Sequence, residues 1–246
     1  ISAIDREDDI YRPSDIEDIE PGTVPESGSS PAEEYINENI APALPVAKNV
    51  ILFIGDGMGA DLRKAASWFS AGMNGALVMD ELDVHGIIRT YAANDPRTDS
   101  AASTTAMAAG IKTNRRAVGL DMNMDPVPTI LELAKLEGKS VGLVTNVMIS
   151  DATPAAFAAH VESRYKMTEI AQQSLSAEVD VLLGGGEDDF YPDDEVGCFP
   201  GPGHRTDDKN LITVAEQMGY VYICDPDSLR EVDSSSGKPL LGLFGG

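Results

Sequence analysis

The stretch Arg97-Thr98-Asp99-Ser100-Ala101-Ala102-Ser103-Thr104-Thr105-Ala106 places a polar turn directly before a run of small residues. The run ends at Gly110, so it predicts a short, closely packed helix that stops at a glycine. Asp99 takes the N-cap position, and Ser100 is the first helical residue, where free N–H groups and the helix dipole favour phosphate or another anion. Taken alone, this pattern is more typical of an ordinary capped helix with a surface serine.

Apolar runs alternate with helical patterns along the rest of the chain. The run Asn49–Ile54 fits a strand buried on both faces. Strands alternating with helices predict an α/β fold, a three-layer α/β/α sandwich with a mainly parallel central sheet. The expected elements after Ile54 are helices at 62–69, 129–138, 167–175 and 211–218, and strands at 85–91, 140–145, 179–183 and 220–224.

Composition divides the chain into two parts. Residues 1–46 are acidic and rich in Pro, Gly and Ser, which favours an extended, solvated arm with at most a short helical turn at 35–40. The aspartates of this arm lack the ordered spacing of a calcium loop. Residues 47–246 are expected to form the α/β domain. The start at Ile1 and the lack of a signal peptide indicate a processed or trimmed product.

Charge and cysteine content restrict the function. The net charge of −23 argues against a nucleic-acid partner and requires local positive charge, from metal ions or arginines, at any site for an anion. No apolar run is long enough to cross a membrane. Cys198 and Cys224 are the two cysteines, and whether they form a disulfide stays open.

Three predicted loops carry polar residues at the carboxyl ends of strands, where function collects in parallel sheets. They contain Asp56 between two glycines, Asp99-Ser100, and Asp151-Ala152-Thr153-Pro154. The third leads on to Arg164, whose planar fork suits two phosphate oxygens. The alternatives are a plain turn around Asp56 and a surface salt bridge at Arg164.

Together these motifs resemble the alkaline phosphatase family over roughly residues 48–192. The matching stretches are Asn49 to Gly59, Thr98-Asp99-Ser100-Ala101-Ala102-Ser103, and Asp151-Ala152-Thr153-Pro154-Ala155-Ala156 through Ser163-Arg164, with weaker similarity at 110–113, 129–134 and 181–186. The resemblance implies a metal-dependent phosphomonoester hydrolase that uses a covalent phosphoserine, two zinc ions and one magnesium ion. It also implies a homodimer when complete, in the periplasm or secreted.

The resemblance assigns a role to each matching residue. Ser100 matches the nucleophile and is expected to bind a metal, and Asp56 matches the carboxylate that bridges a zinc and the magnesium. Thr153 matches a magnesium ligand, and Asp151 the residue that holds water around that magnesium. Arg164 matches the arginine that grips the phosphate, with Asp99 beside it in the substrate site.

The chemistry of the residues agrees with these roles. A serine hydroxyl is a poor nucleophile, and no histidine lies within a few residues of Ser100 to act as its base. His160 is expected to pack against its own helix. A metal at the serine oxygen would stabilise the alkoxide, and cations with Arg164 would neutralise the transferred phosphoryl group.

The chain departs from the family at its C-terminal end. The Asp and His motifs that supply most zinc ligands, and a further magnesium glutamate, are missing, since the sequence ends at Gly246. We expect either the N-terminal part of an enzyme or a chain completed by a second chain with the C-terminal half. The alternatives are a related phosphodiesterase, sulfatase or mutase, and an inactive fragment that binds phosphate or a partner.

Three other features carry weaker expectations. One of the adjacent Arg115 and Arg116 is expected to draw anionic substrates inward, unless both are ordinary surface charges. Trp68 is expected in the core. The acidic region 188–208 is either a surface loop or an additional ion site. The physiological substrate, the metal in each site and any salt adaptation are left open.

Overall fold

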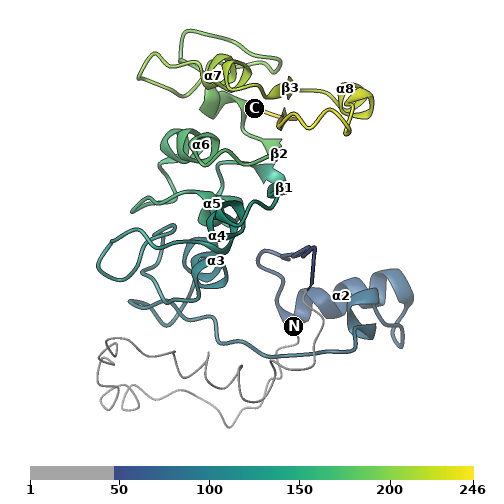
Figure 1. Cartoon of the computed structure of the whole chain (residues 1–246). Helices are drawn as coiled ribbons and strands as arrows, with labels where there is room; N and C mark the ends of the chain where they lie inside the picture. The colour runs from purple at the N-terminus through teal and green to yellow at the C-terminus, as the bar shows by residue number, and fades with distance from the viewer. Residues whose placement is uncertain (1–46) are drawn as a thin grey trace. The chain divides into compact units, whose positions relative to one another are not determined.

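The computed structural model describes residues 47–246 and divides the chain after Ile87 into two units, each described by itself (Figure 1). The acidic arm at 1–46 and the helical turn at 35–40 lie outside the described residues. These expectations, and the domain boundary at residue 47, therefore stay predictions.

The first unit contains helix α2, Ala60–Ala71, and the 3-10 helix η2, Val78–Glu81. The helix expected at 62–69 is therefore confirmed. It ends where Gly72 adopts φ 77°, a conformation that favours glycine, and the Gly72 amide donates to the Trp68 carbonyl at 3.1 Å. Arg63 forms an ion pair with Asp80 at 3.3 Å, which links α2 to η2.

The expected strands at 49–54 and 85–91 were wrong. Neither segment forms a strand, and their apolar side chains, apart from the half-buried Ile54, are exposed, up to 89% for Phe53. A strand exists only where a neighbour completes its hydrogen bonds, and residues 47–87 contain no strand and no buried residue. Trp68 is half exposed rather than buried in a core, for the same reason.

The second unit is built on a parallel sheet in the order β1-β2-β4-β3. The strands are β1, Gly142–Met148; β2, Val181–Gly185; β3, Val221–Ile223; and β4, Leu240–Leu243. In the register, Val181 lies opposite both Gly142 and Leu240. The predicted α/β fold with a mainly parallel sheet is confirmed.

Strand β4 was missed by the sequence analysis, which treated 240–246 only as the end of the chain. All four of its residues are buried, because β4 lies between β2 and β3. A side chain at Gly242 would come within 2.6 Å of Leu183, so this close strand packing needs glycine. The run Leu240-Leu241-Gly242-Leu243 carried the signal of a buried strand.

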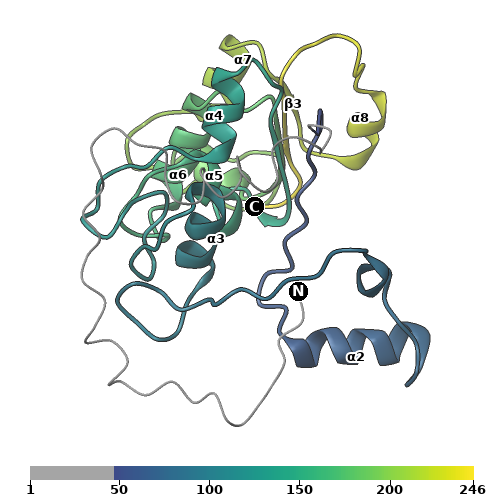
Figure 2. The same ribbon diagram turned by 60° about the horizontal axis from the view of Figure 1, so that its bottom comes forward.

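Helices flank the sheet in the second unit. They are α3, Ser100–Ala109; α4, Ile130–Leu136; α5, Ala152–Ala158; α6, Met167–Ser176; α7, Leu211–Gln217; and α8, Pro226–Glu231, with the 3-10 helix η3 at Glu187–Phe190. Figures 1 and 2 show α3 to α6 on one side of the strands and α8 on the other. Helix α8 was not expected from the sequence, and α5 was expected only as the helix of His160, without bounds.

The core of the second unit lies where α3 packs on α5. Its buried residues are mostly small, which lets the two helix backbones approach closely; they are Ala101, Val118, Ala152, Ala155, Ala156, Ala159, Val161 and Ile170. The opposite face of β1 is less covered, since Val144 is 73% exposed. The sheet thus holds the N-termini of α3 and α5 close together on its helix-covered side.

Candidate active site

The predicted helix around Ser100 is present and begins and ends as expected. Asp99 is its N-cap and Ser100 its first residue. Asp99 Oδ1 accepts a hydrogen bond from the Ala102 amide at 3.1 Å, and Gly110 ends the helix with φ 72°. The serine therefore sits at the positive end of a helix ten residues long.

A second helix N-terminus carries two more predicted site residues. Asp151 follows the carboxyl end of β1 and caps α5, where its side chain accepts from the Ala152 amide. Thr153 is the second residue of α5. Pro154 occupies the third position, where its lack of an N–H costs nothing because first-turn amides have no partner within the helix.

Arg164 contacts the N-cap residues of both helices, α3 and α5. Its Nη2 donates to Asp151 Oδ1 at 2.7 Å, and its Nη1 lies 3.7 Å from Asp99 Oδ2. All three side chains are largely buried. The structure thus brings the adjacent residues Asp99 and Ser100 together with Asp151 and Arg164, which lie more than 50 residues further along the chain.

The remaining predicted site residue belongs to the first unit. Asp56 lies in an exposed turn in which the Met58 amide donates to the Gly55 carbonyl at 3.2 Å. Gly57 follows with φ 64°, the left-handed conformation that favours glycine. The turn predicted after residue 54 is present, although the strand expected before it is not.

Two carboxylates face a single guanidinium in this cluster, so its formal charge is negative. A phosphate dianion would be repelled by the surplus carboxylate unless further positive charge stood nearby. The side-chain oxygens of Ser100 and Thr153 are of the kind that a hard cation such as Mg²⁺ prefers, and Asp56 of the first unit carries a carboxylate of the same kind. They offer no nitrogen or sulfur, and a catalytic zinc site usually includes such ligands.

The histidines of the second unit serve other contacts. His160 Nδ1 lies 2.6 Å from the Gly119 carbonyl oxygen, and its Nε2 lies 2.9 Å from Glu132 Oε1. Glu132 closes the predicted capping box of α4 with Thr129. His160 therefore links α4 to the segment after α5, a structural role that fits the expectation that it packs rather than catalyses.

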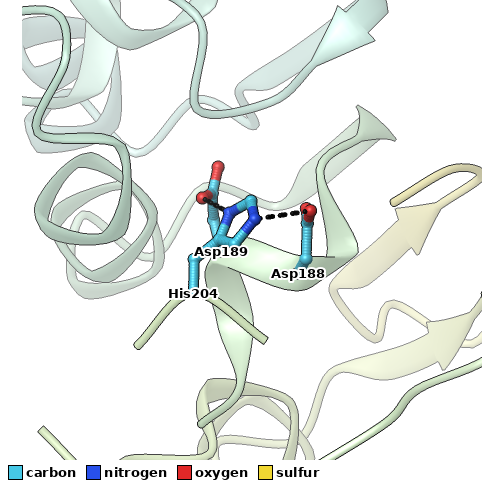
Figure 3. A group of neighbouring side chains, drawn as sticks. All are labelled: Asp188, Asp189 and His204. Carbon is cyan, nitrogen blue, oxygen red and sulfur yellow. Dashed lines mark hydrogen bonds and ion pairs between the residues drawn. The ribbon is translucent and has the colours of Figure 1, made fainter. Parts of the chain in front are cut away.

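The acidic region at 188–208 contains a cluster of Asp188, Asp189 and His204, whose ligand atoms lie within 4.8 Å of one another (Figure 3). Both ring nitrogens face carboxylates: Nδ1 lies 3.0 Å from Asp189 Oδ1, and Nε2 lies 3.1 Å from Asp188 Oδ2. Only the protonated ring donates from both nitrogens, and the hydrogen bond to Asp189 raises the pKa of His204.

This cluster is tied to the candidate active site through a buried hydrogen bond. The Ser150 hydroxyl donates to Asp189, whose side chain is only 1% exposed, and Ser150 directly precedes Asp151. Arg205, also buried, donates to the carbonyls of Thr168 and Asp189 at 2.6 and 3.3 Å. The sequence analysis missed Ser150, Asp189 and Arg205, because none of them stands in a motif.

The two cysteines are paired with each other in the folded chain. Cys198 and Cys224 form a disulfide, with their Cα atoms 6.4 Å apart. The fully buried Glu187 accepts from the amides of Cys198 and Phe199 at 2.9 and 3.2 Å, and from the Tyr222 hydroxyl. These hydrogen bonds satisfy a carboxylate that would otherwise be costly to bury.

Known proteins of one family are similar to most of this chain. The family described as alkaline phosphatase matches residues 47–246. The repressible alkaline phosphatase of Saccharomyces cerevisiae is 39% identical over 211 residues, which cover 80% of this chain and 37% of that protein. Alkaline phosphatase of Escherichia coli is 39% identical over 225 residues, which cover 80% of this chain and 46% of that protein.

Solved structures of alkaline phosphatases are similar in fold to this chain. A cold-active alkaline phosphatase from a psychrophilic Shewanella superposes with a TM-score of 0.67 at 33% identity, over 78% of this chain and 44% of that one. Alkaline phosphatase from the Antarctic bacterium TAB5 gives a TM-score of 0.62 at 26% identity, over 75% of this chain and 50% of that one. A TAB5 variant was solved with Mg bound in a site called M3.

The fold is that of the α/β proteins that these solved structures represent. The chain belongs to the alkaline phosphatase family. It spans only about half, or less, of the length of the relatives described above. Within residues 47–246, no helix is long and apolar enough to cross a membrane.

Proposed function

We propose that this chain is the phosphoryl-accepting part of a metal-dependent phosphomonoesterase. The observation that carries the proposal is the position of Ser100 at the start of α3, beside an Arg164 held between Asp99 and Asp151. Phosphoryl transfer needs mainly positioning and charge neutralisation, and this arrangement supplies both a nucleophile and a fork for the phosphate oxygens.

The proposed reaction takes place in two steps on the chain's own residues. The Ser100 oxygen attacks phosphorus while the bond to the leaving oxygen breaks, and the serine proton passes through water to that oxygen, which departs as the alcohol. Water then attacks the phosphoserine and releases inorganic phosphate and the serine hydroxyl. Arg164 holds two non-bridging oxygens throughout, and the N-terminus of α3 stabilises the negative charge.

Bound cations would supply charge neutralisation and favour the serine alkoxide. We propose Asp56, Ser100 and Thr153 as direct ligands and Asp151 as a residue that orients metal-bound water. This oxygen donor set fits one magnesium ion, whereas the two zinc ions of the family pattern need ligands that these residues do not provide.

Assembly and location are also proposals. We propose a homodimer for the complete enzyme, and a second chain with the C-terminal half as a source of the further ligands. The exposed apolar side chains of residues 50–53 support a missing packing partner. A periplasmic or secreted location is supported by the Cys198–Cys224 disulfide, because such bonds persist in oxidising compartments.

The test is phosphate release by the purified protein with added Zn²⁺ and Mg²⁺. Ser100→Ala is expected to abolish turnover and to prevent the phosphoryl adduct that mass spectrometry should find on the Ser100 peptide. Ser103→Ala, in the same helix, is the matched control and should keep both. Turnover that survives Ser100→Ala would contradict the mechanism, and a wild-type protein without turnover or adduct would favour the inactive-fragment alternative.

A further inference from the structure

Arg116 borders the candidate active site in a way that the proposed reaction does not explain. Two antiparallel segments run side by side here: Val118 and Val161 exchange backbone hydrogen bonds at 2.9 Å, and the Arg164 amide donates to the Arg116 carbonyl at 2.9 Å. The Arg116 amide in turn donates to Asp99 Oδ1 at 3.2 Å. The backbone of Arg116 is thus bonded to both residues that flank the phosphate position.

The backbone conformation of Arg116 is unusual for its residue type. Its φ is 74°, in the left-handed region where glycine is favoured and other residues are strained. Glycine would fit this turn without that strain. An arginine kept in a glycine conformation, next to a candidate active site, indicates that the side chain is needed there.

The charge of the Arg116 side chain is available to a ligand. The neighbouring Arg115 is committed to an ion pair with Asp95 at 3.3 Å. Within the described part of the chain, the Arg116 guanidinium pairs with no carboxylate and instead lies over the ring of Tyr165, 5.6 Å from its centroid. Tyr165 directly follows Arg164 and is 67% exposed.

We infer that Arg116, supported by Tyr165, forms a subsite that recognises a second negative group on the leaving alcohol of the phosphoester. The inference rests on the proposed function and adds a substrate class, phosphomonoesters with a nearby carboxylate or second phosphate. Two carboxylates already surround Arg164, so a polyanionic ester needs a further cation beside that cluster. The cation–π contact holds the guanidinium without neutralising it.

The test compares two non-hydrolysable phosphonates that differ by one carboxylate, propylphosphonate and 3-phosphonopropionate, by titration calorimetry in the same metal-containing buffer. The wild-type protein is expected to prefer 3-phosphonopropionate by roughly tenfold at low ionic strength, as for a charge-assisted hydrogen bond, and less at high ionic strength. Arg116→Gln should bind both equally. Arg115→Gln is the matched control and should keep the preference.

A second variant separates recognition from structure. Arg116→Gly relieves the backbone strain, so its melting temperature should equal or exceed that of the wild type while the preference is lost. If Arg116→Gln still prefers the ligand with the carboxylate, the subsite is wrong. If Arg164→Gln at the same time binds both ligands more weakly than the wild type, the proposed function is unaffected. A wild-type protein that binds neither ligand would overturn both.

Discussion

Arg164 is the residue on which the candidate active site depends most directly. Without its guanidinium, Asp99 and Asp151 would face the phosphate with no intervening cation. Arg164→Gln should weaken phosphate binding by about 1.5–3 kcal/mol, the usual value of a hydrogen bond to a charged group. Titration with inorganic phosphate measures the loss, and Arg97→Gln, an exposed arginine, is the control. Equal affinity in both variants would contradict the assigned role.

His204 makes the stability of its loop depend on pH. The hydrogen bond to Asp189 raises the pKa of His204 above its ordinary value of 6.5. A raised folded-state pKa gives stabilisation that is complete below pH ~6.5 and is lost as the pH rises through the folded-state pKa. Melting temperatures should therefore fall less between about pH 6 and 9 in His204→Gln than in the wild type. Parallel curves for the two proteins would show that the imidazolium contributes nothing.

At the scale of elements, the packing of α3 on α5 decides how near Ser100 comes to Arg164. The contact is made by alanines, so there is no room for a larger side chain. Ala155→Leu should destabilise the protein by about 1–3 kcal/mol through overpacking and displace the Ser100 helix. Denaturant unfolding measures the change, with Ala66→Leu on the exposed face of α2 as control. An unchanged free energy of unfolding in Ala155→Leu would mean that α3 and α5 can move apart at little cost.

At the scale of the whole chain, the disulfide closes the loop from Cys198 to Cys224, and the amide of Cys198 donates to the buried Glu187. Its cysteines are 26 residues apart, and closure of such a loop stabilises a fold by about 3.5 kcal/mol in the chain-entropy estimate. Cys198→Ser with Cys224→Ser should lower the free energy of unfolding by about this amount. Reduction of the wild type should reproduce the loss and leave the double variant unaffected. Equal stability of oxidised and reduced protein would contradict the estimate.

Sequence motifs were sufficient to predict those elements whose ends are set by residues close by in the chain. The helix at Ser100 is determined by Asp99 at its start and Gly110 at its end, and the α4 capping box by Thr129 and Glu132. The parallel sheet followed from the alternation of apolar strands and helices, since crossover connections produce parallel neighbours. The motifs around Ser100, Asp151 and Arg164 also indicated the family that the comparisons confirm.

Contacts between distant segments were decided only by the tertiary structure. The apolar run at 49–54 satisfies the strand pattern but finds no strand to pair with in its unit, whereas Leu240–Leu243 becomes the most enclosed strand because β2 and β3 lie on both sides. The Cys198–Cys224 pairing, the burial of Asp189 and the availability of the Arg116 charge likewise depend on neighbours far along the chain. The spacing of apolar residues along the sequence indicates which side chains prefer burial, but only the folded chain determines which segment packs over them.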